Sequence, residues 1–205
     1  MTVIIDYNIV NLASVLKAFK AVGEKAIIVK SSSEIRKADR IVLPGVGSFN
    51  DGIKNLHELN LEDSIKEAVL HKQRPFLGIC LGMQLLASEG FEFGKHKGLD
   101  IIKGQVHQIE SAGQPALLLP HMGWNDILPT QKCHLFSDID ENDMTFYFAH
   151  SYHLIPRTDN VIAAKTNYGI NFVSAIQRDN IVATQFHPEK SQENGFTFLK
   201  NFLKI

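Results

Sequence analysis

The sequence predicts an α/β domain with a mostly parallel central sheet, helices on both faces of that sheet, and an antiparallel extension. Through the first hundred residues, short apolar strand candidates alternate with amphipathic helix candidates, a pattern typical of parallel sheets. Beyond residue 100 nearly all candidates are strands, which predicts the antiparallel part. The 205 residues are 44% hydrophobic and contain no repeat and no linker-like stretch. We therefore expect one domain over residues 1–205.

The first elements form strand and helix units. Residues 2–5 are an apolar strand candidate, and residues 11–22 carry apolar side chains at helical spacing, with Gly23 as the expected end of that helix. The further elements expected before residue 100 are strands over residues 26–29, 40–43 and 75–79 and a helix whose apolar face includes Leu61, Ile65, Ala68 and Val69.

The second half of the chain is dominated by strand candidates. They cover residues 105–109, 116–119, 145–148, 161–165, 172–176 and 181–186. A last amphipathic helix is expected from the spacing of Phe198, Leu199, Phe202 and Leu203.

Composition excludes several classes of function. The net charge is -1 and the basic residues are scattered, so we expect neither a nucleic-acid nor a membrane partner. The chain begins without the basic start and cleavage site of a signal peptide, which predicts a cytoplasmic protein. Cys80 and Cys133 are the two cysteines, and their spacing fits neither a disulfide framework nor a zinc site. We expect no metal and no cofactor.

The strongest chemical signal is Gly-Ile-Cys-Leu-Gly at residues 78–82, followed by helix-favouring residues. Glycines on both sides of Cys80 permit a sharp strand-to-helix turn, the nucleophile elbow, which we expect to expose the thiol at a helix N-terminus. The positive end of the helix dipole favours the reactive thiolate there. An isolated cysteine is more often a buried structural residue, and the flanking glycines argue against that alternative.

A base for this nucleophile is predicted in the run Phe-His-Pro-Glu-Lys-Ser at residues 186–191. Residues two apart in an extended segment point to the same side, so Glu189 is expected to contact the imidazole of His187. Taken alone, such a run is more often a turn with solvated charges. Together with Cys80 it predicts a Cys-His-Glu triad.

The segment Pro-Gly-Val-Gly at residues 44–47 follows a strand and predicts a loop with accessible backbone amides. A tetrahedral oxyanion needs preorganised donors, and we expect the Leu81 amide together with that of Val46 or Gly47 to supply them. The run does not match a dinucleotide or P-loop fingerprint, so a nucleotide site is not expected.

Four segments together resemble the glutaminase subunits of imidazole glycerol phosphate synthase, which are class I glutamine amidotransferases. The segments are Pro-Gly-Val-Gly at residues 44–47, Gly-Ile-Cys-Leu-Gly-Met-Gln at 78–84, Leu-Pro-His-Met-Gly-Trp-Asn at 119–125, and Phe-His-Pro-Glu-Lys-Ser at 186–191. The resemblance covers nearly the whole chain. It implies the class I amidotransferase fold and a γ-glutamyl thioester on Cys80, with His187 carrying protons and Glu189 supporting His187.

The resemblance also implies a substrate pocket and a partner. Glutamine would be held by Gln84, Glu92, His150, Ser151 and Tyr152. Ammonia would pass to a (β/α)-barrel cyclase in a heterodimer that makes imidazole glycerol phosphate and AICAR for histidine biosynthesis. The residues expected at the partner surface and ammonia gate are Asn11, Trp124, Asn125, Tyr147 and Lys190. Packing on a sheet face would explain Tyr147 and Tyr152 equally well.

One segment departs from the family pattern. The family carries Gly-x-Gly-Asn after the first strand, whereas this chain has Asn8, Val10 and Asn11 there, and a β-branched Val10 does not suit positive φ. The alternative acceptor is therefore a sugar of bacterial surface glycans, amidated by the partner of a paralogous subunit. A cysteine hydrolase of related fold would also carry an elbow cysteine, but the His187-Pro188-Glu189 run and Gln84 argue against that alternative. An inactive binding subunit is a second alternative, and the intact Cys80, His187 and Glu189 argue against it.

Overall fold

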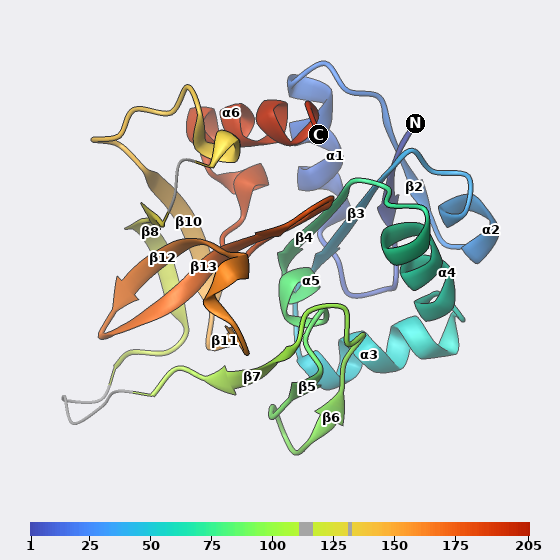
Figure 1. The fold of residues 1–205 in the computed structure, drawn as a ribbon, viewed down its shortest axis with the longest axis horizontal. Helices are drawn as coiled ribbons and strands as arrows, with labels where there is room; N and C mark the ends of the chain where they lie inside the picture. Colours follow the sequence, from blue (N-terminus) through green and yellow to red (C-terminus); the bar gives the residue numbers. More distant parts are fainter. Residues whose placement is uncertain (111–116, 131–132) are drawn as a thin grey trace.

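The computed structural model describes residues 1–110, 117–130 and 133–205. The strands of its main sheet are β1 (Thr2–Ile5), β2 (Ala26–Val29), β3 (Arg40–Gly45), β4 (Phe76–Cys80), β9 (Leu128–Pro129), β12 (Ile162–Tyr168), β13 (Ile170–Arg178) and β14 (Ile181–Thr184). They are ordered β2-β1-β3-β4-β14-β13-β12-β9 (Figure 1). The strands from β2 to β14 pair in parallel, and those from β14 to β9 pair antiparallel. The predicted mixed sheet is confirmed, although β14 was expected in the antiparallel part and is instead the last parallel strand.

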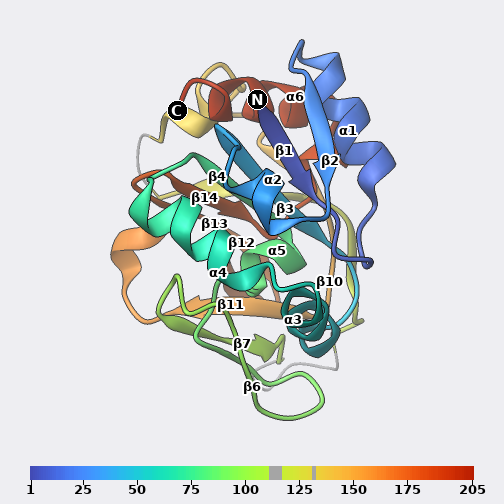
Figure 2. The ribbon, with the colours of Figure 1, turned by 90° about the vertical axis from the view of Figure 1, so that its right-hand side faces the viewer.

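Helices cover both faces of the sheet, as the sequence predicts (Figures 1 and 2). One face is covered by α1 (Leu12–Ala21) and α6 (Gln192–Phe202), and the other by α2 (Ser32–Ile35), α3 (Phe49–Glu58) and α4 (Glu62–Lys66), which continues into the π-helical turn η1 (Glu67–His71). Successive side chains of β1 alternate between these two cores. Val3 and Ile5 pack with the α3 and α4 side, whereas Ile4 packs with α1 and α6.

Two smaller sheets extend from the carboxyl ends of the parallel strands. The first pairs β8 (His121–Asp126) with β10 (Thr145–His150), and the second has the order β11-β7-β5-β6, with β11 at Tyr152–Pro156, β7 at Gly104–Gln108, β5 at Glu89–Gly90 and β6 at His96–Lys97. Short 3-10 turns complete the chain: η2 (His134–Phe136), η3 (Asp159–Val161) and η4 (Pro188–Lys190). These extensions build one wall of the site described below.

Three expectations about these regions were wrong or incomplete. No strand was predicted over residues 120–125, but residues 121–126 form β8, paired along its length with β10. Within the strand expected over residues 116–119, residue 116 lies outside the described residues and residues 117–119 form no strand. The helix α3 was not predicted, because it buries only Phe49, Gly52 and Leu56 and so has a thin apolar stripe. In the described part of the chain no helix is long and apolar enough to span a bilayer.

Candidate active site

The turn from β4 into α5 (Leu81–Gln84) places Cys80 at the carboxyl edge of the parallel strands. Cys80 has φ 54° and ψ -107°, a conformation that side chains with a Cβ rarely adopt. A Cβ on Gly82 would lie 1.8 Å from the Leu43 carbonyl oxygen, and one on Gly78 would lie 2.9 Å from the Gly82 oxygen. Both glycines are therefore required by the close packing of the elbow, as the sequence predicts.

The thiol of Cys80 is less accessible than expected. The residue is 6% exposed, so the predicted exposed thiol is wrong as stated. Ala149 and His187 line the same cavity as Cys80, and the Ala149 carbonyl lies 3.9 Å from Cys80 Sγ. The Cys80 thiol thus opens into this cavity rather than onto the outer surface.

His187 and Glu189 meet as the sequence predicts, but through a different backbone. His187 Nδ1 lies 2.8 Å from Glu189 Oε1, and both side chains are almost fully buried. The segment is not extended at this point, because residues 188–190 form the 3-10 turn η4 with His187 as its N-cap. With Nδ1 bonded to Glu189, Nε2 is the ring nitrogen that remains for Cys80.

The electrostatics of this pair favour a charged imidazole. Burial alone disfavours the imidazolium, but the charge of Cys80, the hydrogen bond to Cys80 and the contact with Glu189 outweigh it and raise the pKa of His187 to about 10. At neutral pH the site therefore holds an imidazolium between a sulfur and a carboxylate. An imidazolium beside Cys80 favours the thiolate.

One cavity of about 440 Å³ brings together most of the predicted site residues. Those lining it are Val46, Gly47, Cys80, Leu81, Gln84, Glu92, His150, Ser151, Tyr152, His187 and Lys190. Glu189 lies behind His187 rather than in the wall. The cavity also has Ser48, Pro120 and Ala149 in its lining, which were not predicted.

The two predicted oxyanion donors, the backbone amides of Leu81 and Val46, differ in their hydrogen bonding. Leu81 is the first residue of α5, so its amide has no carbonyl partner within that helix. The Val46 amide, in contrast, donates to the Ile9 carbonyl at 2.9 Å. Ile9 belongs to the segment that departs from the family pattern, where Asn8 takes φ 74°. The Val46 donor is therefore engaged by the loop after β1 in this conformation.

Glu92 supplies an acidic group to the lining of the cavity. Its Oε2 accepts a hydrogen bond from the Phe49 amide at 2.7 Å, which fixes the carboxylate. Burial raises the pKa of Glu92, and the Phe49 amide partly offsets that effect. A fixed carboxylate in a pocket can bind an ammonium group.

Three of the predicted partner-surface residues form one cluster. Trp124 and Tyr147 are paired across β8 and β10, with ring centroids 6.1 Å apart, and Lys190 Nζ lies 5.5 Å from the Tyr147 ring centroid. Trp124 remains 48% exposed. Asn125 instead turns its amide inward and donates to His121 and to the Asn167 carbonyl. Asn11 is exposed at the N-cap of α1 and lines none of the cavities found among the described residues.

A residue that contacts Cys80 was not predicted from the sequence. Gln185 is fully buried, and its Nε2 lies 3.6 Å from Cys80 Sγ. Gln84 Nε2 donates to Gln185 Oε1 at 3.0 Å, which fixes the direction of the Gln185 amide. Its position two residues before His187 was the only available signal, since the contact spans 105 residues of sequence.

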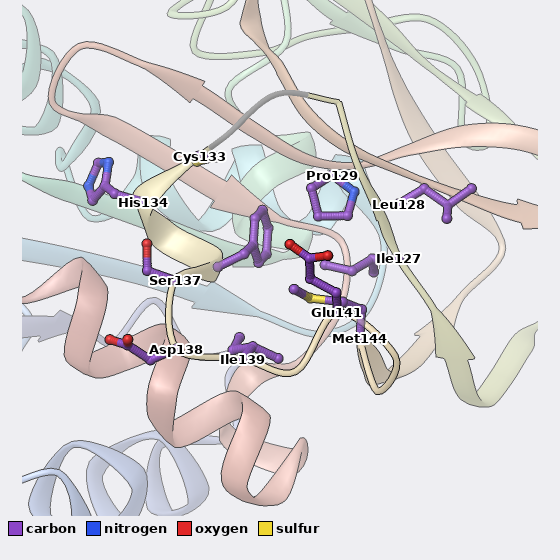
Figure 3. A pocket seen from close by; sticks show the side chains of 11 residues that line it. Ile127, Leu128, Pro129, Cys133, His134, Ser137, Asp138, Ile139, Glu141 and Met144 are labelled. Atoms are coloured by element: carbon purple, nitrogen blue, oxygen red, sulfur yellow. The ribbon is translucent and has the colours of Figure 1, made fainter.

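A second cavity, of about 620 Å³, contains none of the predicted site residues (Figure 3). Its walls are mostly apolar and include Ile127, Ile139 and Met144. Cys133 also lines it, and its thiol donates to Gln177 Oε1 at 2.8 Å. Burial raises the pKa of Cys133, which keeps this thiol neutral and disfavours a nucleophilic role.

Comparison with known proteins defines the class of this fold and site. The family described as glutamine amidotransferase class-I matches residues 3–205. A chain in the structure of PurLQS from Thermotoga maritima has the same fold, with a TM-score of 0.75 at 16% identity over 99% of this chain and 97% of that one. The chain belongs to the class-I glutamine amidotransferases.

Full-length relatives narrow the family further. The chain is 45% identical over 205 residues to imidazole glycerol phosphate synthase subunit HisH 1 of Campylobacter jejuni strain RM1221, covering 100% of both chains. It is 46% identical over 202 residues to subunit HisH of Aquifex aeolicus, covering 98% of this chain and 95% of that one. Within its class, the chain thus falls in the family of these HisH subunits, and the resemblance seen in the sequence is confirmed.

Proposed function

We propose that this chain hydrolyses glutamine to glutamate and ammonia, with Cys80 as the nucleophile and His187 as the proton carrier. One observation carries the proposal: a cysteine at a strained elbow meets a buried imidazole whose other nitrogen is bonded to Glu189 at 2.8 Å. This arrangement supplies a thiolate, a general acid and an orienting carboxylate in one cavity.

The first half-reaction forms a thioester. The Cys80 thiolate attacks the side-chain carbonyl carbon of glutamine, and the carbonyl oxygen becomes an oxyanion. His187 gives its Nε2 proton to the amide nitrogen, the C–N bond breaks, and ammonia leaves. The products are a γ-glutamyl thioester on Cys80 and a neutral His187, whose Nδ1 proton remains on the hydrogen bond to Glu189.

The second half-reaction restores the enzyme. Neutral His187 takes a proton from water at Nε2, and the resulting hydroxide attacks the thioester carbonyl. The C–S bond breaks, glutamate leaves, and the thiolate again faces an imidazolium. Glu92, held by the Phe49 amide, is suited to bind the α-ammonium group of the substrate, and Gln84, Ser151 and Tyr152 line the remaining walls.

The oxyanion step includes a gate. The Leu81 amide is available at the start of α5, whereas the Val46 amide is engaged by the Ile9 carbonyl at 2.9 Å. Completing the oxyanion hole requires rotation of the peptide between Gly45 and Val46 or use of the Gly47 amide. We therefore expect the isolated chain to hydrolyse glutamine slowly, and a partner loaded with acceptor to accelerate it by orders of magnitude. Full turnover by the purified chain alone would contradict this gate.

The ammonia acceptor is proposed from the relatives. Their names describe subunits of imidazole glycerol phosphate synthase, which favours a cytoplasmic heterodimer with a (β/α)-barrel cyclase in histidine biosynthesis over the surface-glycan alternative. The exposed Trp124 with Tyr147 and Lys190 beside the cavity is suited to be the partner surface and ammonia gate. Asn125 supports this surface indirectly, because its side-chain amide is hydrogen-bonded to His121 and to the Asn167 carbonyl rather than presented to a partner.

The direct test replaces Cys80 by alanine in the complex with the cyclase. Glutamine-dependent product formation should be lost, whereas ammonium salts should still support the synthase reaction, because the thiolate serves only to make ammonia. The wild-type complex assayed with ammonium is the matched control. Failure of ammonium to support a Cys80→Ala complex that still assembles would refute the division of labour.

The pathway is tested by complementation. Expressed with its own cyclase, the chain should restore growth of a histidine auxotroph that lacks this subunit, and Cys80→Ala should not. Failure by a well-expressed, partner-bound wild-type chain would favour surface-sugar amidation and leave the glutaminase chemistry in place.

A further inference from the structure

A chain of buried hydrogen bonds leads from β8 toward the nucleophile, and its protons can be assigned. His150 Nδ1 lies 2.8 Å from the Tyr152 carbonyl, which can only accept, so Nδ1 carries the proton. In the neutral ring Nε2 is then an acceptor, and His121 Nδ1 at 3.0 Å must donate to it. The remaining acceptor, His121 Nε2, receives Asn125 Nδ2 at 3.1 Å. Both imidazoles are thus Nδ1–H tautomers.

Burial keeps this pair of histidines neutral. His121 is 3% exposed and His150 is 6% exposed. Burial lowers the pKa of His121 to about 4 and that of His150 to about 3. The proton assignments therefore hold at neutral pH.

The same carbonyl connects the histidines to Cys80. The Tyr152 carbonyl also accepts Gln84 Nε2 at 2.8 Å, and the second proton of that amide goes to Gln185 Oε1 at 3.0 Å. Gln185 then has only its Nε2 left to face Cys80 Sγ, at 3.6 Å. The reverse orientation of the Gln185 amide would place an oxygen against the sulfur and repel a thiolate.

We propose, on the basis of the glutaminase function proposed above, that Gln185 stabilises the Cys80 thiolate by donating a hydrogen bond from Nε2. His121 and His150 are then positioning residues, which hold the side-chain amides of Gln84 and Gln185 in the required direction. The histidine pair fixes the carbonyl of Tyr152, the carbonyl fixes Gln84, and Gln84 fixes Gln185. An N–H donor to a buried thiolate offsets part of the cost of removing that charge from water.

The test uses alkylation of Cys80 by iodoacetamide in the full chain without glutamine, together with kcat and KM for glutamine in the cyclase complex. Gln185→Met removes the donor at similar length and should slow alkylation and lower kcat about tenfold, with little change in the KM for glutamine. His121→Phe keeps the ring stacked on Tyr168 and Phe148 but removes both hydrogen bonds. It should slow alkylation at least about threefold.

Two variants separate positioning from packing. His121→Asn places an amide donor where Nδ1 stands, so it should restore alkylation to within about twofold of wild type. His153→Phe is the matched control, because His153 is also buried and lies outside this series of hydrogen bonds, and its Nδ1 has no partner among the described residues. It should alkylate at the wild-type rate. Equal slowing by His153→Phe, or wild-type rates in both Gln185→Met and His121→Phe, would overturn the proposal.

Nitrogen-15 NMR of the wild-type chain tests the assignment even if a variant fails to fold. His121 and His150 should each show one protonated nitrogen, Nδ1, at neutral pH, and an Nε2–H tautomer of either ring would overturn the proposal. The alkylation test does not require glutamine as substrate. A wild-type complex without glutaminase activity would therefore refute the proposed function. An active complex whose variants are unaffected would refute only the proposed role of this series of hydrogen bonds.

Discussion

Two buried histidines, His187 and His150, line one cavity and differ in charge at neutral pH: His187 is an imidazolium and His150 is neutral. The pKa of His187 is raised to about 10, and that of His150 is lowered to about 3. Burial acts on both rings in the same direction, against the charged form. What differs is the neighbours, since His187 lies between Cys80 and Glu189, whereas His150 faces a carbonyl and a second neutral imidazole.

In the mechanism proposed above, this difference divides the site into a charged part that reacts and a neutral part that orients it. The charged part lies at the ends of parallel strands and in η4, where a strained elbow and a 3-10 turn bring together residues far apart in sequence. The neutral part is built by the antiparallel pair β8 and β10, in which His121 and His150 are direct partners. A histidine in a protein interior can thus serve either purpose, and its hydrogen-bond partners decide which.

The largest expected effect comes from removing the proton carrier of the charged part. His187→Gln should lower glutamine-dependent kcat by about 10³-fold or more, because it removes both the general acid and the counter-charge of the thiolate. Ammonium-dependent activity of the cyclase complex is the control and should remain. A loss of tenfold or less in kcat would mean that His187 is not the proton carrier.

A second experiment asks whether Cys80 is responsible for the charge on His187. Titration of the His187 ring by NMR should show it protonated at pH 7 and losing its proton toward about pH 10. In Cys80→Ala the pKa should fall steeply, because burial then acts against only the contact with Glu189. The pKa values of His121 and His150 should change little, which makes them internal controls. An unchanged pKa of His187 in Cys80→Ala would contradict the explanation that its neighbours set the charge of each histidine.

The comparison also predicts how stability changes with pH. His121, His150 and His153 have depressed folded pKa values, so their contribution is full above the unfolded pKa of about 6.5. It is lost as pH falls toward about 4 for His121 and His153 and toward about 3 for His150. The pKa of His187 is raised, so its contribution is full below about 6.5 and is lost as pH rises toward about 10. Each differing proton contributes a slope of about 1.4 kcal/mol per pH unit.

Urea unfolding of wild type and variants at a series of pH values measures the two sides of this dependence separately: the acid limb lies below about pH 6.5 and the alkaline limb above it. His187→Gln should flatten the alkaline limb, and His121→Phe should flatten the acid limb, while replacement of the exposed His71 by glutamine should alter neither. A flattened acid limb in His187→Gln would reverse the assignment of charged and neutral histidines.

Local chemistry explains what could be predicted from the sequence. The elbow requires glycine at positions 78 and 82 because the neighbouring backbone lies within 3 Å of where a Cβ would stand, and that requirement is visible in the residues themselves. The contact between His187 and Glu189 is also local, so it was predicted although the backbone there is a 3-10 turn rather than extended. The alternation of strands and helices likewise predicted the parallel sheet.

The parts that could not be predicted depend on distant contacts or inverted patterns. In β8 the polar His121 is buried while Met122 and Trp124 are exposed, the reverse of the usual alternation, so the pattern did not predict a strand there. The direction of the Gln185 amide and the engagement of the Val46 amide by Ile9 are set by atoms remote in sequence. No local propensity encodes them.

The central claim is that Cys80 is the nucleophile that attacks glutamine, and covalent labelling tests it most directly. The complex is treated with diazo-oxo-norleucine, a reactive glutamine analogue, and the labelled peptide is identified by mass spectrometry. We predict one equivalent of label on Cys80, appearing in parallel with the loss of glutaminase activity and slowed by glutamine, with ammonium-dependent activity retained. Complete loss of glutaminase activity with the label on another residue and Cys80 unmodified would contradict the account.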